Sequence, residues 1–69
     1  MTETNDFMTT AEVARLTRAP ESTVRYWRHC GTGPRSFRLG RRVLYRRGDV
    51  DRWIEDREQA DQDSRAAGW

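Results

Sequence analysis

The chain has 69 residues, 35% of them charged and 35% hydrophobic, and a formal net charge of +2. This length allows one small domain with one small core, which excludes a multidomain protein. A mean hydropathy of −1.06 would suit a disordered chain, but three Trp, two Tyr and two Phe supply the large apolar groups that such chains lack. We therefore expect a folded centre.

The sequence carries no sign of export. No apolar run approaches the length of a membrane span, and residues 1–6 lack the basic and hydrophobic regions of a signal peptide. Cys30 is the single cysteine, so the chain forms no internal disulfide, which fits a reducing compartment. These features predict a cytoplasmic protein without contact to a membrane.

Charge falls into three blocks along the chain. Residues 1–17 have a net charge of −2, residues 18–48 carry nine Arg against Glu21 for +8, and residues 49–69 have −4. All thirteen basic residues are Arg, which suits bidentate contacts to phosphate and guanine. The aromatic residues within the basic block are Tyr26, Trp27, Phe37 and Tyr45. A basic block with interleaved aromatic residues predicts a nucleic-acid-binding surface.

The first predicted helix has a well-specified start. Thr9 and Glu12 have the spacing of a capping box, and Met8 and Val13 occupy the two positions of a hydrophobic staple. The helix is expected to run to about Thr17. Residues 1–7 before it show no periodicity and predict a disordered leader.

The second predicted helix spans residues 20–31. Pro20 suits the first helical position and Gly31 supplies the stop. Val24 and Trp27 share one face and would anchor the helix to a core, which leaves a basic face exposed. Residues 18–20 between the two helices form a short turn, so the pair suggests a helix-turn-helix.

A hairpin is predicted next. Residues 36–39 alternate as a strand, Gly40 and Arg41 suit a two-residue turn, and residues 42–46 are rich in β-formers. A charged hairpin tip is often only solvated, but beside a basic helix we interpret it as a wing that reaches a minor groove or the backbone of DNA.

A third helix is predicted to open at Gly48 and Asp49. One face is expected to be buried, formed by Val50, Trp53, Ile54 and Arg57. Beyond Ile54 there is no apolar stripe, so residues 59–69 are expected to be a polar helical extension or a disordered tail. The folded domain is therefore predicted to span residues 8–58.

Four segments in this order resemble the MerR-type winged-helix DNA-binding domains of the excisionase group: MTTAEVA (8–14), STVRYW (22–27), FRLGRR (37–42) and DVDRWI (49–54). The segment GTGPR (31–35) is similar to excisionases of temperate actinobacterial phages, also called recombination directionality factors. The resemblance implies a small α+β winged helix-turn-helix in the order helix, helix, β-hairpin wing, helix.

The resemblance also implies a function. Such a protein has no catalysis of its own, binds double-stranded DNA at tandem sites cooperatively, bends it, and directs integrase toward prophage excision in the bacterial cytoplasm. Its partners would be DNA, integrase and neighbouring copies of itself, with no cofactor, metal or small-molecule substrate. The recognition-helix positions carried over are Ser22, Thr23, Arg25, Tyr26, Arg28 and His29. The wing positions are Arg38, Arg41 and Arg42, and charge alone adds Arg35, Arg46 and Arg47 as phosphate contacts.

Two other functions remain open at this point. A small transcription regulator would use the same domain at a promoter, although the polar residues after Ile54 leave no room for the dimerisation helix or effector domain usual in such regulators. A protein-only module that binds integrase conflicts with the +8 block. An enzyme is not expected, because His29 and Cys30 point about 100° apart on one helix and no nucleophile-base set accompanies them.

Overall fold

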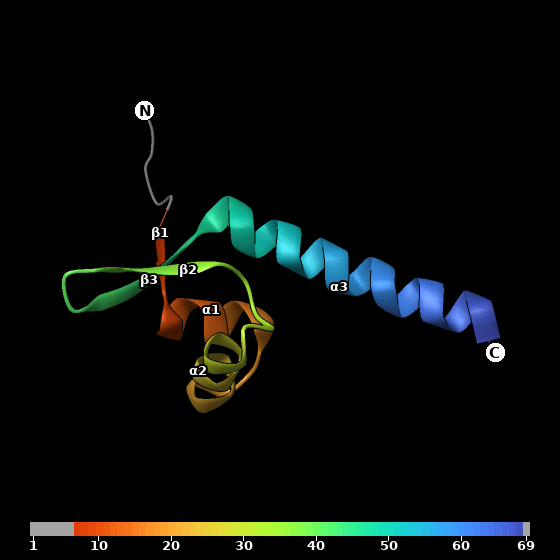
Figure 1. Cartoon of the computed structure of the whole chain (residues 1–69), viewed down its shortest axis with the longest axis horizontal. Coiled ribbons are helices and arrows are strands. Elements are labelled where there is room, and N and C mark those ends of the chain that lie inside the picture. Colours follow the sequence, from red (N-terminus) through yellow and green to blue (C-terminus); the bar gives the residue numbers. More distant parts are fainter. Residues whose placement is uncertain (1–6, 69) are drawn as a thin grey trace.

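The computed structural model describes the backbone of residues 7–68 and the side chains of residues 7–64. Its elements follow in the order β1 (Phe7–Thr9), α1 (Thr10–Thr17), α2 (Glu21–Cys30), β2 (Ser36–Leu39), β3 (Arg42–Arg46) and α3 (Arg47–Gly68) (Figure 1). Three helices and a three-stranded antiparallel sheet make the expected small α+β fold, with a helix-turn-helix followed by a hairpin wing.

The first strand was not predicted. Phe7, assigned to the disordered leader, belongs to β1, which pairs antiparallel with β3 so that Met8 lies opposite Tyr45. The sheet order is therefore β1-β3-β2. A three-residue strand is too short to show periodicity, and its partner lies far along the chain, so no local pattern announces it. The remainder of the predicted leader, residues 1–6, lies outside the described residues.

The capping box of α1 is confirmed. The backbone N–H of Glu12 donates to the Thr9 hydroxyl at 3.2 Å, and the N–H of Thr9 donates to the Glu12 carboxylate at 2.8 Å. The helix ends at Thr17 and is capped by Arg18, whose backbone is left-handed with φ of +60°, and the N–H of Ala19 donates to the Ala14 carbonyl. The short turn into α2 begins at this left-handed residue.

The predicted start of α2 is corrected by one residue. Pro20 has an extended ψ of 151° and is the N-cap, so the helix begins at Glu21. The Pro20 carbonyl still accepts the first helical hydrogen bonds, from the N–H groups of Thr23 and Val24. Gly31 ends the helix as predicted, in a left-handed conformation with φ of +74° that a glycine adopts without steric cost.

The core lies between the sheet and the three helices. Its buried members are Met8, Val13, Ala14, Val24, Tyr45 and Val50. Trp27 of α2 and Trp53 of α3 meet at its edge with ring centroids 5.2 Å apart, and the Trp53 indole N–H donates to the Thr32 carbonyl at 2.9 Å. This contact fixes the root of α3 against α2 and the loop that follows it.

The third helix extends beyond the stretch of sequence in which apolar residues recur at helical spacing. It begins at Arg47, before the predicted Gly48, and continues to Gly68. Val50, Trp53 and Ile54 pack inward as predicted, but Arg57 is exposed, at the edge of a groove between α3 and the first two helices. We call residues 55–64 the acidic arm. Of the two predictions for residues 59–69, the helical extension holds as far as Gly68; Trp69 is not among the described residues.

None of the helices in the described part of the chain is long and apolar enough to cross a membrane.

Candidate nucleic-acid interface

Helix α2 buries one narrow face and exposes the rest. Val24 is fully buried, with 0% exposure, and Trp27 packs toward α3. Around the remaining arc, the predicted contact residues Ser22, Arg25, Tyr26, Arg28 and His29 are exposed, and Thr23 is half-buried. The structure thus leaves accessible the face that the sequence pattern indicated.

Within that arc, Arg25 is held by a neighbour on the same helix. Its guanidinium lies 3.3 Å from the Glu21 carboxylate, one helical turn earlier, and both side chains are at least half exposed. An exposed pair of this kind contributes only about 0.2–0.5 kcal/mol. The pair orients Arg25 and is weak enough to exchange for a base or phosphate.

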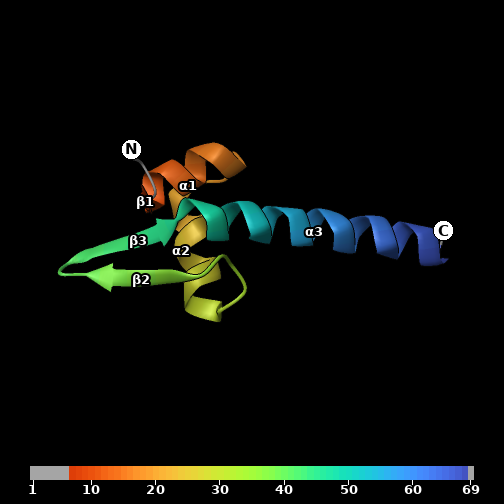
Figure 2. The same ribbon diagram turned by 90° about the horizontal axis from the view of Figure 1, so that it is seen from above.

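Arg28 joins α2 to the wing. Its Nε–H donates to the Ser36 hydroxyl at the start of β2, at 3.0 Å. Figure 2 shows α2 running across the direction of β2 and β3, so this bond ties the helix to the base of the hairpin. Ser36 was not singled out from the sequence, since a serine at a strand start carries no signal of its own.

Beneath Arg28, the Tyr45 phenol is buried against the helices. Burial raises the pKa of Tyr45 above its ordinary value of 10.0, while the Thr10 side chain and the charge of Arg28 act in the opposite direction. No hydrogen bond of ordinary geometry reaches the Tyr45 hydroxyl among the described residues. The phenol therefore remains neutral at physiological pH and serves as a packing group.

The register of the hairpin separates two faces of the wing. Ser36 and Tyr45 are partners, and so are Arg38 and Val43, so these residues face α2. Phe37 pairs with Leu44, and Leu39 with Arg42, on the opposite side. Because side chains alternate along a strand, Arg38 shares the side of Ser36 and extends the basic surface of α2.

The tip of the wing carries three arginines. Arg38, Arg41 and Arg42 are exposed, and none of them makes a hydrogen bond or ion pair within the described residues. Gly40, before Arg41, has φ of +66°, which permits the tight turn. The tip therefore presents three guanidinium groups that make no hydrogen bond or ion pair with the described residues.

Arg46 and Arg47 lie apart from these groups. The Arg46 guanidinium stacks over Phe7, 5.0 Å from the ring centroid, and lies 5.9 Å from that of Phe37. It is therefore on the side of the sheet away from Arg38. Arg47 pairs with Asp51 at 3.3 Å. The structure does not bring these two predicted phosphate contacts together with the α2 surface.

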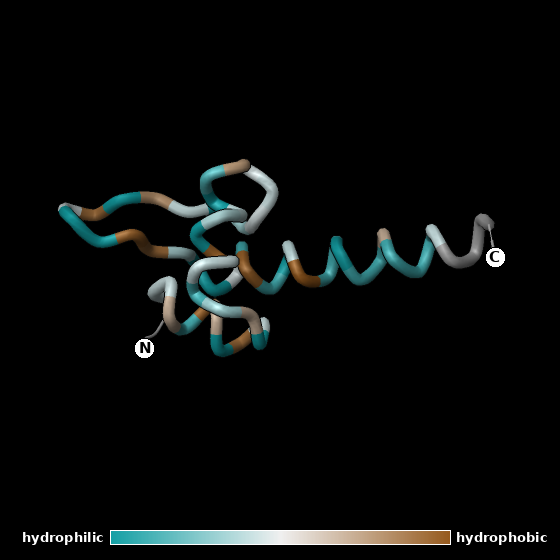
Figure 3. The backbone as a smooth tube through the Cα atoms, turned by 90° about the horizontal axis from the view of Figure 1, so that it is seen from below, coloured by the Kyte–Doolittle hydropathy of each residue, from teal (hydrophilic) through white to brown (hydrophobic). Residues whose placement is uncertain are grey.

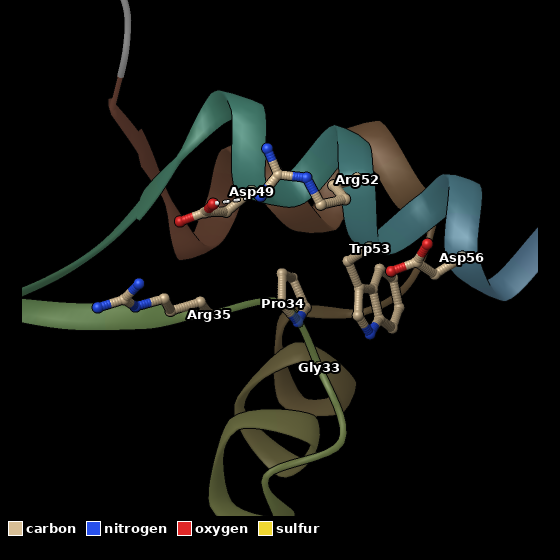
Figure 4. Close-up of a pocket in the computed structure, with 7 residues that line it drawn as sticks. All are labelled: Gly33, Pro34, Arg35, Asp49, Arg52, Trp53 and Asp56. Atoms are coloured by element: carbon tan, nitrogen blue, oxygen red, sulfur yellow. Dashed lines mark ion pairs between the residues drawn. The ribbon is translucent and has the colours of Figure 1, made fainter.

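Arg35 lies at one end of a shallow cleft between the α2–β2 loop and α3 (Figure 4). The cleft has a volume of about 240 Å³ and is also lined by Asp49, Arg52, Trp53 and Asp56. Asp49 pairs with Arg52 at 3.6 Å. Asp49 and Asp56 balance Arg35 and Arg52 in formal charge, so the cleft has no excess positive charge to hold an anion, and Arg35 is a phosphate candidate as an exposed side chain.

The family model described as a helix-turn-helix domain matches residues 7–58, which include all of β1 through β3 and the packed root of α3. The chain matches no curated protein and no solved structure.

Proposed function

The chain belongs to the helix-turn-helix domain family, a DNA-binding family that includes excisionase-like proteins, and from this premise we propose that it is a MerR-like, non-enzymatic DNA-binding protein of the excisionase type. It recognises duplex DNA, bends it, and directs integrase-mediated recombination toward excision. It acts on DNA in the bacterial cytoplasm, without a cofactor or small-molecule substrate.

One observation carries the DNA-binding part of the proposal. The exposed arc of α2 and the α2-facing side of the wing form adjoining basic surfaces, and the Arg28–Ser36 hydrogen bond joins them. A helix inserted in the major groove reads base edges, while a neighbouring β-ribbon contacts the backbone or the minor groove. In this arrangement Arg25 reads a base, Arg38 contacts a phosphate from the α2-facing side of the wing, and Arg41 and Arg42 contact phosphates from its tip.

The small size of the domain supports binding by several copies. A single module of this kind buries about 600–1,000 Å² on DNA, which gives limited selectivity among competing sites. The acidic arm lacks the apolar seam of a coiled coil, because Ala60 is its one apolar residue. Tandem copies that assemble only on DNA, and bend it together, meet this requirement.

The excisionase part of the proposal draws on the resemblance of the four sequence segments described above. The described residues supply a helix-turn-helix, a wing and a polar helix, which are parts that an architectural DNA-binding protein needs. A protein of this form serves as an architectural element, which changes the path of DNA and leaves the chemistry to its partner, the integrase.

Two assays test the proposal in turn. Duplexes selected by the protein from a randomised pool are first compared with scrambled duplexes, and a preference of at least about 10³-fold is expected for specific binding. The selected site is then placed beside attachment sites with the cognate integrase, and added protein is expected to increase excision and suppress integration. Equal affinity for all duplexes contradicts specific recognition. Specific binding without any change in recombination overturns the excisionase part alone.

A further inference from the structure

A single carboxylate interrupts the basic surface of α2 and the wing. Glu21 is the one acidic residue of the +8 block, residues 18–48. Most other acidic side chains of the described chain lie on α3, whose projecting part is almost entirely hydrophilic (Figure 3). Glu21 opens α2, and its side chain is half exposed. Because phosphates repel a carboxylate, Glu21 weakens the binding of DNA unless it makes a favourable contact there.

Glu21 holds one particular arginine. Its carboxylate lies 3.3 Å from Nη1 of Arg25, one helical turn later. The Arg28 guanidinium instead donates to the neutral hydroxyl of Ser36, and the three tip arginines make no hydrogen bond or ion pair with the described residues. Among the described residues, Arg25 is therefore the arginine of this surface whose charge is compensated by a carboxylate.

This compensation favours a base over a phosphate as the target of Arg25. A phosphate beside Arg25 would also meet the Glu21 carboxylate, and the two negative charges repel each other. The edge of guanine is uncharged and offers two acceptors, O6 and N7, to one guanidinium. A guanidinium carries five N–H donors, so Arg25 has enough of them to serve guanine and Glu21 together.

The carboxylate of Glu21 has acceptor sites to spare. One oxygen accepts from Arg25, whereas a carboxylate offers about four acceptor sites in total. In the major groove, cytosine presents an amino group that a glutamate accepts from, while guanine and thymine present no donor. Adenine places its amino group beside the N7 acceptor, which repels a carboxylate. Cytosine is therefore the base that matches Glu21.

The spacing of the pair places the two bases side by side. Side chains about one turn apart on a helix in the major groove contact successive bases. Since Glu21 and Arg25 also touch each other, no base pair separates their targets. We propose that Glu21 is a specificity-determining residue, which reads a cytosine in the base pair next to the guanine read by Arg25. This inference rests on the proposed DNA-binding function.

The first test compares the sites that the wild type and three variants select from a pool of randomised duplexes. Arg25→Ala is expected to lose the preference for guanine at one position. Glu21→Gln is expected to change the adjacent position from cytosine to adenine, because glutamine pairs with the N6 and N7 groups of adenine. Asp51→Asn is the matched control, since it removes the same charge from an exposed pair of the same length, 3.3 Å to Arg47, on α3. It should select the wild-type site.

Modified bases test the two contacts atom by atom. N4-methylcytosine keeps its Watson–Crick pair but replaces the amino hydrogen that faces the major groove. At the selected cytosine it is expected to lower the affinity of the wild type by about tenfold, and that of Glu21→Gln by less than about twofold. A guanine analogue with carbon in place of N7 should likewise weaken the wild type and spare Arg25→Ala.

The outcomes separate this proposal from the proposed function. Loss of the cytosine preference at the adjacent position supports the contact, with or without a gain of adenine. An unchanged site for Glu21→Gln, or a change that does not adjoin the Arg25 position, overturns the proposal while leaving DNA binding intact. Equal affinity of the wild type for methylated and unmethylated duplexes also overturns it, and this measurement needs no variant. Failure of the wild-type protein to prefer any duplex overturns the proposed function as well. Circular dichroism verifies that each variant folds.

Discussion

The body of the molecule, residues 7–54, and its acidic arm, residues 55–64, differ in both packing and charge. Every buried residue of the described chain lies in the body, whereas all residues of the arm are exposed. The body also contains the +8 block, while the arm carries −4. The arm nevertheless continues the same helix, supported by its packed root and by local bonds such as Gln59 to Asp63 at 3.0 Å. One short chain thus separates the part that folds and binds from the part that projects.

The largest effect is expected from Val24→Asp in the body. Val24 is 0% exposed beneath α2, so an aspartate there buries a charge without a partner and costs more than about 4 kcal/mol. A domain this small is expected to lose its cooperative thermal transition in circular dichroism. Ala60→Asp in the arm is the counterpart and should leave that transition unchanged. A folded Val24→Asp protein would contradict the assigned core.

Gly33→Ala is expected to destabilise the body next most strongly. A Cβ at Gly33 would lie 2.8 Å from the Trp27 Cβ, which forces the α2–β2 loop away from α2 and costs about 1–3 kcal/mol. Gly48→Ala meets open space within α3 and should gain up to about 1 kcal/mol. Urea unfolding measures both changes, and equal stabilities for the two variants would refute the close packing at Gly33.

Arg25 of the basic surface and Arg57 of the acidic arm are expected to differ in their contribution to DNA binding. Arg25→Ala should cost about 1–3 kcal/mol in binding to the selected duplex and relax discrimination at one base position. Arg57→Ala, in the arm, should not weaken binding. Fluorescence anisotropy against selected and scrambled duplexes separates the two. If Arg25→Ala keeps the wild-type affinity ratio, α2 is not the reading helix.

The role of the wing is tested by the salt dependence of DNA binding. Replacing Arg41 and Arg42 by alanine should weaken binding to all duplexes and flatten the dependence of log affinity on log salt by about one unit per lost phosphate contact. Folding should survive, since both side chains are exposed. Arg52→Ala, at the root of α3, serves as control. The same slope for the double variant and the wild type would mean that the tip is only solvated.

The smallest effect concerns Tyr45. Burial raises the pKa of Tyr45 above 10.0, so the folded state favours the neutral phenol. The contribution of Tyr45 to the free energy of unfolding is therefore fully present below pH 10 and is lost as the pH rises further. Tyr45→Phe removes a hydroxyl without a hydrogen-bond partner, and should change stability at pH 7 by less than about 1 kcal/mol. Urea titrations across alkaline pH should show a smaller loss for the variant, and an equal loss would argue against a buried phenol.

Much of the fold was open to prediction because its signals are local. The Thr9–Glu12 capping box, the Gly31 stop and the hairpin turn at Gly40 each involve residues within a few positions of one another. The inward face of α2 also followed from helical spacing, with Val24 and Trp27 placed as expected. For the candidate site, this periodicity sufficed to show which α2 side chains would be exposed.

Two details of the structure depend on partners distant in sequence. Arg46 is a phosphate contact predicted from charge alone, and the pairing of β1 with β3 places it beside Phe7, on the side of the sheet away from Arg38. Arg57 continues the helical spacing of a buried face, yet it is exposed at the edge of the groove between α3 and the first two helices. Neither outcome follows from local pattern, because each requires knowing which surface lies opposite.

The sequence by itself determined where the helices and the hairpin form, that Val24 and Val50 enter the core, and that the basic charge is central, since propensity, capping and periodicity act over short stretches of chain. Only the tertiary structure decided that Arg28 bonds Ser36, that the third strand completes the sheet, and that the wing has one face toward α2 and one open face. The physical reason is that strand pairing and helix docking depend on distant surfaces meeting in a unique register, and burial of the shared core selects that register.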